Sequence, residues 1–460
     1  MFAKHPVAWL AGALALAFVL LATGALFAGA ATAKRGDSDS TSADANPAAG
    51  RPQPTELPTA TRLRTCSVSD IANDPKLATL SGVVTNAATG EVLFDRAATV
   101  PIAQAGISKV LTAAAVISLL GPDATLSTKV YQGSMPNTLV LVGGGDPTLS
   151  ALESGESVYS GAPKLAALAD KVKDSYTDGD IDDITAIVLD ASLWSQADKW
   201  DASWPRTAQT TGSQSEVTAL QVDGDRVDPT QQISPRTTDP VSNAGILFAE
   251  ALGLDPTKVT FSLGSAVTSK PMLGEVTSQP ISVLVNQMLM QNDGTLAESL
   301  ARVASKSAGF GGTAASIQQT ITSGLAVYGV PTTGIVIKDG SGLNPATSIP
   351  PKFMSDFMAK VLAGENNLNV VYNSLPVAGK SGGLAQRFAG ASAAAANQVI
   401  AMPGFGAGEQ ALSGVINAAD GAQLAFAFYA VGGTVKDTAR GSLDSLATAV
   451  FACGDNLSNN

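Results

Sequence analysis

Apolar runs separated by glycine-rich turns predict strands in the first third of the chain. The runs 80–86 and 91–95 flank a turn at 88–90, a pattern typical of a β-hairpin. The run 139–142 predicts a buried strand that ends in the glycine-rich turn 143–147. We therefore expect a sheet that begins close to the start of the folded region.

Helical patterns alternate with further strands over the rest of the chain. An Ala- and Leu-rich run from about Ala103 to Leu120 predicts a helix that Gly121-Pro122 ends. Five more elements are expected: helices over 281–308, 314–328 and 438–451, a strand over 334–338, and a hairpin of strands 414–417 and 423–431. A sheet built from the hairpins near both ends and covered by helices is an α+β arrangement.

The first 61 residues differ from the rest of the chain. Residues 1–35 contain an apolar run from about 7 to 33, which as a helix is long enough to cross a hydrocarbon core of about 30 Å. This length favours a retained membrane anchor, and small-residue triplets within 28–33 leave a cleaved signal peptide as the alternative. Residues 36–61 are rich in Ser, Asp, Pro and Ala and predict a disordered linker. Both alternatives place the folded part outside the cytoplasm, and the anchor predicts a single-pass protein of the cell membrane.

Composition excludes some classes of partner. A chain of 460 residues with 45% hydrophobic content can bury more than one core. Its formal net charge of −11 argues against nucleic acids and anionic lipid headgroups, because both require a basic surface.

The two cysteines lie at opposite ends of the folded region. Export permits a disulfide, and the termini of a domain often lie close together, so we predict a Cys66–Cys453 bond. The alternative is a pair of free buried thiols.

Histidine is absent from the exported part, since His5 is the only one and precedes the apolar run. Ser-His-Asp triads, Cys-His pairs and histidine zinc sites are therefore excluded. We expect neither a metal nor a cofactor. A lysine would have to be the base in any acyl-transfer chemistry.

Three signatures follow one another along the chain: VGGGDPTL at 142–149, DGSGL at 339–343 and SLPVAG at 374–379. In this order and approximate spacing they resemble the D-alanyl-D-alanine carboxypeptidase/endopeptidase family, the class C penicillin-binding proteins similar to penicillin-binding protein 4. The resemblance covers roughly 82–453. It implies activity on the D-Ala-D-Ala end of peptidoglycan stem peptides.

The resemblance also implies an architecture. The family has a serine β-lactamase/transpeptidase-like domain, an antiparallel sheet with helices on both faces, which carries an inserted domain. Here the discontinuous main domain is expected at 62–128 and 268–455, and the insertion at 129–267.

The family's first catalytic motif is S-x-x-K, in which the lysine amine takes a proton from the serine hydroxyl. In this chain the serine position is Gly106 and the lysine is Lys109. Ser108 is a poor substitute, because adjacent positions on a helix point about 100° apart. We interpret Ser108 as a solvated or capping residue.

The second motif is S-x-N, whose serine relays protons and whose amide holds the substrate. The aligned residues are Asn292, Asp293 and Gly294. Asn292 can still bind a ligand, but the relay hydroxyl and the second amide are missing.

The third motif is K-T-G, which supplies a positive charge for the substrate carboxylate. Lys380-Ser381-Gly382 matches loosely, but the family's motif follows the SLPVAG signature by some twenty residues, and this register gives Met402, Pro403 and Gly404. Methionine carries no charge, and proline removes a backbone donor and, as we expect, a ladder hydrogen bond. Lys380 is interpreted as a surface lysine.

Loss of all three motifs predicts a pseudoenzyme that binds cell-wall peptide or a protein of the cell envelope. Backbone donors at Gly106 and Phe405, where the resemblance implies an oxyanion hole, can still hold a carbonyl. An active serine carboxypeptidase with non-standard residues and a purely structural domain with a filled cleft remain the alternatives.

Overall fold

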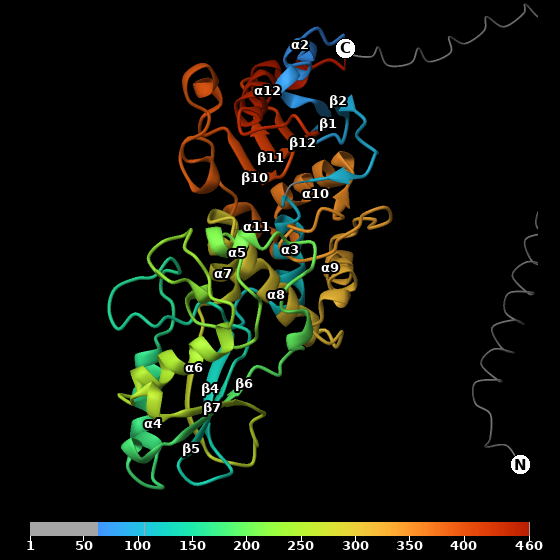
Figure 1. The fold of residues 1–460 in the computed structure, drawn as a ribbon. Helices are drawn as coiled ribbons and strands as arrows, with labels where there is room; N and C mark the ends of the chain where they lie inside the picture. The colour runs from blue at the N-terminus through green and yellow to red at the C-terminus, as the bar shows by residue number, and fades with distance from the viewer. Residues whose placement is uncertain (1–62, 105, 460) are drawn as a thin grey trace, which may run out of the picture. The chain divides into compact units, whose positions relative to one another are not determined.

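The computed structural model describes residues 63–104 and 106–459, which form two β-sheets with helices packed against them (Figure 1). The predicted membrane segment 1–35 and linker 36–61 lie outside the described residues. Within the described part of the chain, no helix is long and apolar enough to cross a membrane.

The first sheet has five antiparallel strands in the order β10-β11-β12-β1-β2. The strands are β1 (Thr79–Asn86), β2 (Val92–Arg96), β10 (Val399–Gly406), β11 (Glu409–Asn417) and β12 (Gln423–Val431). Strand β1 pairs with β12 over its whole length, so the two ends of the folded chain lie side by side (Figure 1). The predicted hairpins at both ends are confirmed.

Helices cover both faces of the first sheet, and β12 is accordingly apolar on both sides. Phe426 and Phe428 pack on the same side as helix α12 (Ala439–Cys453), and Ala425 and Ala427 pack on the side of α10 (Pro351–Ala363). Helix α10 also touches the sheet through a hydrogen bond that Ser355 Oγ donates to Ala425 O, 3.0 Å long.

The remaining helices form a layer beside α10. They are α3 (Lys109–Leu120), α7 (Ile281–Met290), α8 (Gly294–Ser307), α9 (Ile317–Leu325) and α11 (Leu368–Asn373), and a short helix α2 (Ser69–Ala72) packs near α12. Helix α3 is buried on all sides from Lys109 to Ile117. The predicted final helix and the helix within 314–328 are confirmed, the latter with single 3-10 turns at both ends.

Three predicted elements differ from the structure. The helix expected from Ala103 begins at Lys109, because β3 (Ile102–Ala103) pairs with β9 (Ser348–Ile349) and Gly106 has a left-handed φ of 88°. The helix expected over 281–308 is broken into α7 and α8. The strand expected over 334–338 is a single bridge between Val336 and Ser348.

The second sheet is mixed, with the order β7-β6-β5-β4-β8. Its strands are β4 (Ser127–Gln132), β5 (Thr138–Val142), β6 (Ala186–Asp190), β7 (Thr260–Leu263) and β8 (Met272–Thr277), and β5, β6 and β7 run parallel. Helices α4 (Leu165–Ser175) and α6 (Pro240–Ala251) cover it, and a short α5 (Thr207–Thr211) lies in the loops beyond. The sheet therefore runs from Ser127 to Thr277, and the predicted domain bounds stay a prediction.

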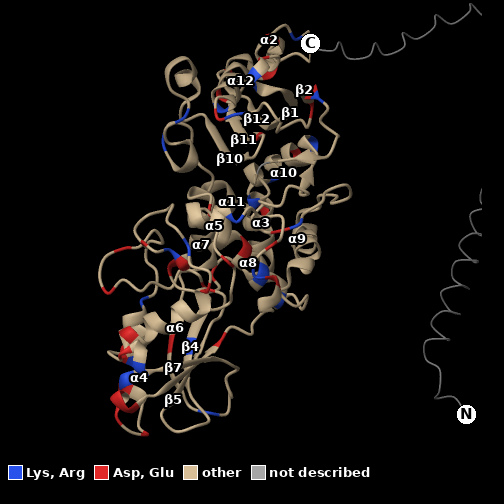
Figure 2. Ribbon diagram, viewed as in Figure 1, with Lys and Arg blue, Asp and Glu red and all other residues tan. Residues whose placement is uncertain are grey.

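Charged residues are sparse and unevenly placed (Figure 2). Residues of both signs gather around α4, and a second group lies in the helical layer near α3 and α8 (Figure 2).

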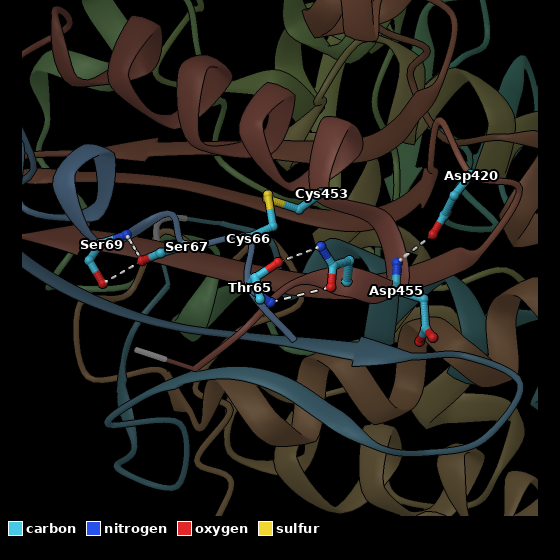
Figure 3. The surroundings of a disulfide bond; sticks show 8 residues. Thr65, Cys66, Ser67, Ser69, Asp420, Cys453 and Asp455 are labelled. Carbon is cyan, nitrogen blue, oxygen red and sulfur yellow. Dashed lines mark hydrogen bonds between the residues drawn. A yellow bond between two sulfur atoms is a disulfide. The ribbon is translucent and has the colours of Figure 1, made fainter. Parts of the chain in front are cut away.

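The predicted disulfide joins Cys66 to Cys453 across a sequence separation of 387 (Figure 3). Thr65 and Asn456 exchange two hydrogen bonds beside it, and Arg64 Nε donates to Asp455 O at 2.8 Å. The bond ties the segment before β1 to the end of α12.

Candidate functional site

Gly106 and Lys109 face each other at the start of α3. A Cβ added to Gly106 would lie 3.2 Å from Lys109 Nζ. The S-x-x-K spacing therefore still places the two positions in contact, although Gly106 lies in a turn before the helix. Glycine offers this lysine no side-chain hydroxyl.

Lys109 is a buried amine without a side-chain hydrogen bond to any described residue, and only 4% of its surface is exposed. Burial lowers the pKa of Lys109 to about 8, although Asp339 and Asp293 oppose this change. An amine with this pKa can accept a proton near neutral pH. What the site lacks is a hydroxyl group to give one.

Ser108 does not replace the missing serine. Its side chain is buried, and its Oγ has no hydrogen-bond partner among the described residues. A side chain added at Gly342 would collide with Ser108 Oγ, so the hydroxyl is directed toward the DGSGL turn. The interpretation as a solvated or capping serine is wrong, because this first turn packs inside the protein and no cap bond forms.

The second-motif position forms the turn between α7 and α8. Asn292 has a φ of 53° and directs its Nδ2 toward Pro403 O at 3.5 Å, while its Oδ1 is buried without a partner among the described residues. Asn292 thus spans from this turn to strand β10. Its left-handed backbone explains why α7 and α8 are two helices.

Gly294, the first residue of α8, is covered by a residue that the sequence did not indicate. A Cβ on Gly294 would lie 2.5 Å from Oε1 of Gln214, which is fully buried. Gln214 therefore occupies space into which a larger side chain at Gly294 would extend. No sequence signal points to Gln214, because it comes from a loop eighty residues earlier in the chain.

Asp293 anchors this turn. Its Oδ1 accepts from Leu296 N at 3.0 Å, and its Oδ2 accepts from Tyr159 Oη at 2.7 Å and from Arg226 Nη2 at 2.9 Å. Burial opposes the ionisation of Asp293, but Arg226 and Arg236 outweigh it and lower its pKa to about 2. The carboxylate thus holds α8 against loops of the second sheet.

The third-motif position lies in β10, the edge strand of the first sheet, whose outer side the segment 376–378 covers at 399–401. Met402 is fully buried and brings no charge to the surface. The pairing of β10 with β11 passes through Pro403 without a register shift, so the expected loss of a ladder hydrogen bond is wrong. Because Pro403 O meets Asn292, the main chain of Pro403 faces the free edge, where proline is tolerated.

Phe405 is the first exposed residue of β10, which is buried from Val399 to Gly404. Its ring is 53% exposed, and the guanidinium carbon of Arg440 lies 5.4 Å from the ring centre. The loosely matching Lys380 is exposed in a loop, while its neighbour Gly382 packs against Pro376.

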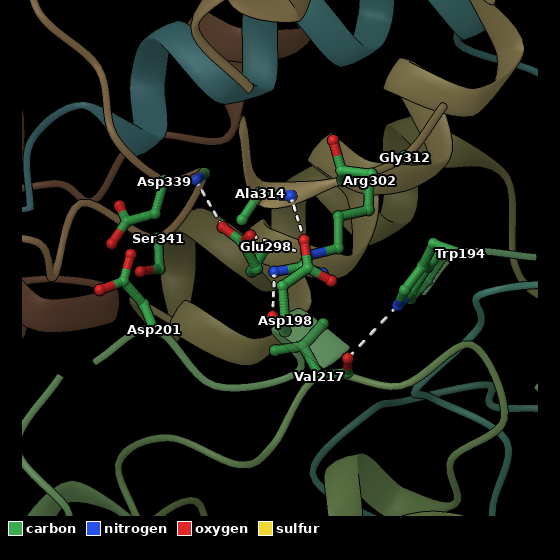
Figure 4. A network of polar contacts seen from close by, with 12 residues as sticks. Trp194, Asp198, Asp201, Val217, Glu298, Arg302, Gly312, Ala314, Asp339 and Ser341 are labelled. Carbon is green, nitrogen blue, oxygen red and sulfur yellow. Dashed lines mark hydrogen bonds and ion pairs between the residues drawn. The ribbon is translucent and has the colours of Figure 1, made fainter. Parts of the chain in front are cut away.

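The DGSGL turn is held by buried acids (Figure 4). Asp339 accepts hydrogen bonds from Trp204 Nε1 at 2.7 Å and from Asn344 N at 2.8 Å. Glu298 accepts from Gly340 N at 2.6 Å and from Arg302 Nε at 2.9 Å. Burial raises the pKa of both acids, and Arg302 opposes this for Glu298. The network fastens the turn to α8, within 3.9 Å of a Cβ at Gly106.

An open cavity of about 440 Å³ lies between the second-motif and third-motif positions. It is lined by the turn 291–293, residues 403–405 of β10, the loop 382–383 and four arginines. A second cavity of about 320 Å³ shares Phe405. Gly106 and Lys109 line neither cavity, so ligand space remains while the lysine is covered. In 63–104 and 106–459, no cluster of three or more His, Cys, Asp or Glu side chains is arranged to hold a metal ion.

Comparisons with known proteins show which family this chain resembles. The model of the D-Ala-D-Ala carboxypeptidase 3 (S13) family matches residues 64–232 and 228–450. The chain is 32% identical to carboxypeptidase DacB of Mycolicibacterium smegmatis, over 96% of this chain and 95% of the relative. It is also 32% identical to carboxypeptidase Rv3627c of Mycobacterium tuberculosis, over 85% and 84%. Penicillin-binding protein 4 of Haemophilus influenzae has a similar fold, with a TM-score of 0.69 and 19% identity over 84% of this chain and 98% of that one.

Proposed function

The chain belongs to the D-Ala-D-Ala carboxypeptidase 3 (S13) family, and we propose that it is a member that binds cell-wall peptide without cleaving it. Membership makes it a carboxypeptidase-family protein of peptidoglycan metabolism. The finer proposal, that the protein is a pseudoenzyme, depends on the chemistry that the residues at the three motif positions allow.

The observation that carries the proposal is the pair Gly106 and Lys109. Acyl transfer through a serine needs a hydroxyl beside a proton acceptor, and here the acceptor faces a hydrogen atom. Loss of a nucleophile leaves only the residual catalysis that binding and an oxyanion hole provide. Of the two expected oxyanion donors, Phe405 lines the cavity and Gly106 does not, and a backbone N–H group can polarise a carbonyl but cannot form a covalent intermediate.

Retention of the cavity supports peptide binding over a purely structural role. The space between Asn292 and Phe405 is not filled by Met402, whose side chain is directed into the core. Asn292 keeps a buried carbonyl oxygen without a partner among the described residues, which a ligand N–H group can satisfy.

Two measurements on the purified full chain test the proposal. Intact-mass spectrometry after incubation with a penicillin should show no adduct, whereas penicillin-binding protein 4 of Haemophilus influenzae serves as the positive control. Calorimetry should show binding of an acetylated peptide that ends in D-Ala-D-Ala, and weaker binding of the same peptide ending in L-Ala-L-Ala. An adduct on any serine would support the alternative, an active carboxypeptidase with non-standard residues.

We also propose that residues 1–35 tether the protein to the membrane, with the folded part outside the cytoplasm. The length of the apolar run supports a retained anchor. We expect the full-length protein in the membrane fraction. Deletion of residues 1–35 should move it to the soluble fraction. Recovery of a processed soluble form would favour signal cleavage instead.

A further inference from the structure

The cavity beside Asn292 is unusually rich in positive charge. Four of its lining side chains are arginines, namely Arg226, Arg236, Arg387 and Arg440, whereas Asp293 is the one acid among the described lining residues. The protein as a whole is acidic, with a formal net charge of −11. The partners of each arginine therefore decide whether this cavity carries free positive charge.

Two of these arginines are neutralised by well-buried partners. Arg226 pairs with Asp293 at 2.9 Å, and Arg387 pairs with Asp444 at 2.6 Å. All four of these side chains are at most 13% exposed. These pairs hold the walls of the cavity and leave no charge for a ligand.

Arg440 is only weakly neutralised. Its partner Asp437 lies 3.0 Å away, but the Asp437 side chain is 80% exposed and that of Arg440 is 40% exposed. Exposed pairs of this kind attract each other only weakly, because solvent screens both charges. Arg440 also stacks on Phe405 and donates to Gln410 Oε1 at 3.1 Å, which directs it toward the open edge of β10.

Arg236 has no carboxylate within salt-bridge distance among the described residues. Its guanidinium donates to the backbone carbonyls of Gly212 and Gly224 instead. Burial and the nearby Arg226 lower the pKa of Arg236, and the more distant Asp293 and Asp225 only partly oppose this. A buried guanidinium that is hydrogen-bonded only to carbonyl groups lacks a directly paired anion, and a bound carboxylate would supply one.

We infer that this cavity binds a carboxylate group of the ligand and that Arg236 and Arg440 supply its positive charge. The inference rests on the proposed function, in which the ligand is a peptide with a free C-terminal carboxylate. The two arginines would then provide the charge that Met402 cannot. Gln410 and Gln386 add neutral amide donors to the same wall.

The test compares two peptides on the full chain by calorimetry. Both end in D-Ala-D-Ala, one with a free carboxylate and one with a C-terminal amide, and free acetate is a third probe. We expect the acid to bind about tenfold more tightly than the amide, with a preference that weakens as salt is raised. Binding of acetate alone at similar affinity would show an unspecific anion site and overturn the role of the peptide end.

Substitutions assign the preference to residues. Arg440→Gln should remove most of the preference for the acid, and Arg440→Lys should keep part of it. Arg96→Gln is the matched control, since Arg96 also stacks on a phenylalanine, Phe94 at 6.0 Å, but lies outside the cavity. Arg236→Gln should act like Arg440→Gln, and near-ultraviolet circular dichroism checks that this buried variant is folded.

Each outcome has one meaning. Equal binding of acid and amide overturns this inference and leaves the proposed function standing. A preference that survives both Arg440→Gln and Arg236→Gln places the carboxylate elsewhere and also overturns it. Failure of every peptide to bind overturns the proposed function, and the inference with it.

Discussion

Replacing Lys109 by methionine is expected to stabilise the protein. The pKa of the buried amine is about 8, against an ordinary value of 10.5. At about 1.4 kcal/mol for each pH unit of this difference, keeping Lys109 protonated at pH 7 costs the folded state about 3 kcal/mol. Methionine fills a similar volume without a charge, so Lys109→Met should recover most of this amount.

The pH dependence provides the sharper part of the test. Because the folded amine has the lower pKa, its cost is fully present below about pH 8 and decreases as the pH rises toward 10.5. The advantage of Lys109→Met should therefore fall from about 3 kcal/mol at pH 7 to about 1 kcal/mol at pH 10.

Urea unfolding at both pH values measures this difference, with the exposed Lys380→Met as a control that should change nothing. If Lys109→Met is less stable than the natural protein, attraction to Asp339 and Asp293 outweighs burial and the reasoning is refuted. An advantage that is equal at pH 7 and pH 10 would refute it as well, because a titrating amine cannot produce it.

Three further predictions concern stability. The double replacement Cys66→Ser and Cys453→Ser should lower the free energy of unfolding by about 2–5 kcal/mol, measured by urea unfolding, because the bond closes a very long loop. Gly294→Asn should lower the melting temperature because its Cβ would lie 2.5 Å from Gln214 Oε1, and the double variant with Gln214→Ala should recover part of the loss. Burial raises the pKa of Asp146 to about 6 although Thr148 opposes this, so its ionisation costs the folded state above pH 6 and not below the unfolded pKa of 3.8. Asp146→Asn should therefore stabilise the protein at pH 7 and lose this advantage as the pH falls from 6 to 4, as thermal unfolding would show.

Local patterns were sufficient to predict the hairpins and the final helix. Strand β12 is apolar at nearly every position, and its turn residues Asp420-Gly421 separate it clearly from β11. Helix starts were harder to predict, because Gly106 is compatible with a helix until its left-handed backbone is seen. Asn292 breaks the predicted helix 281–308 for the same reason, and the turn residues Asp293-Gly294 that follow it are the local signal that could have marked the break.

Motif spacing predicted which positions of the site would meet, but not what surrounds them. Lys109 faces Gly106 as the spacing implied. Gln214 and Arg236, by contrast, come from loops of the second sheet, and their places depend on how those loops pack against α8. Contacts between distant segments carry no local sequence signal.

The pairing of β1 with β12 has a consequence for the order of synthesis. Strand β1 leaves the ribosome early, yet its neighbour β12 begins only at Gln423, so the middle of the first sheet stays incomplete until nearly the whole chain has been made. The second sheet is made from one continuous stretch, 127–277, and can assemble before β1 has its partner strand β12. Over this interval the apolar faces of β1 and β2 are exposed, which makes the nascent chain dependent on protection from aggregation.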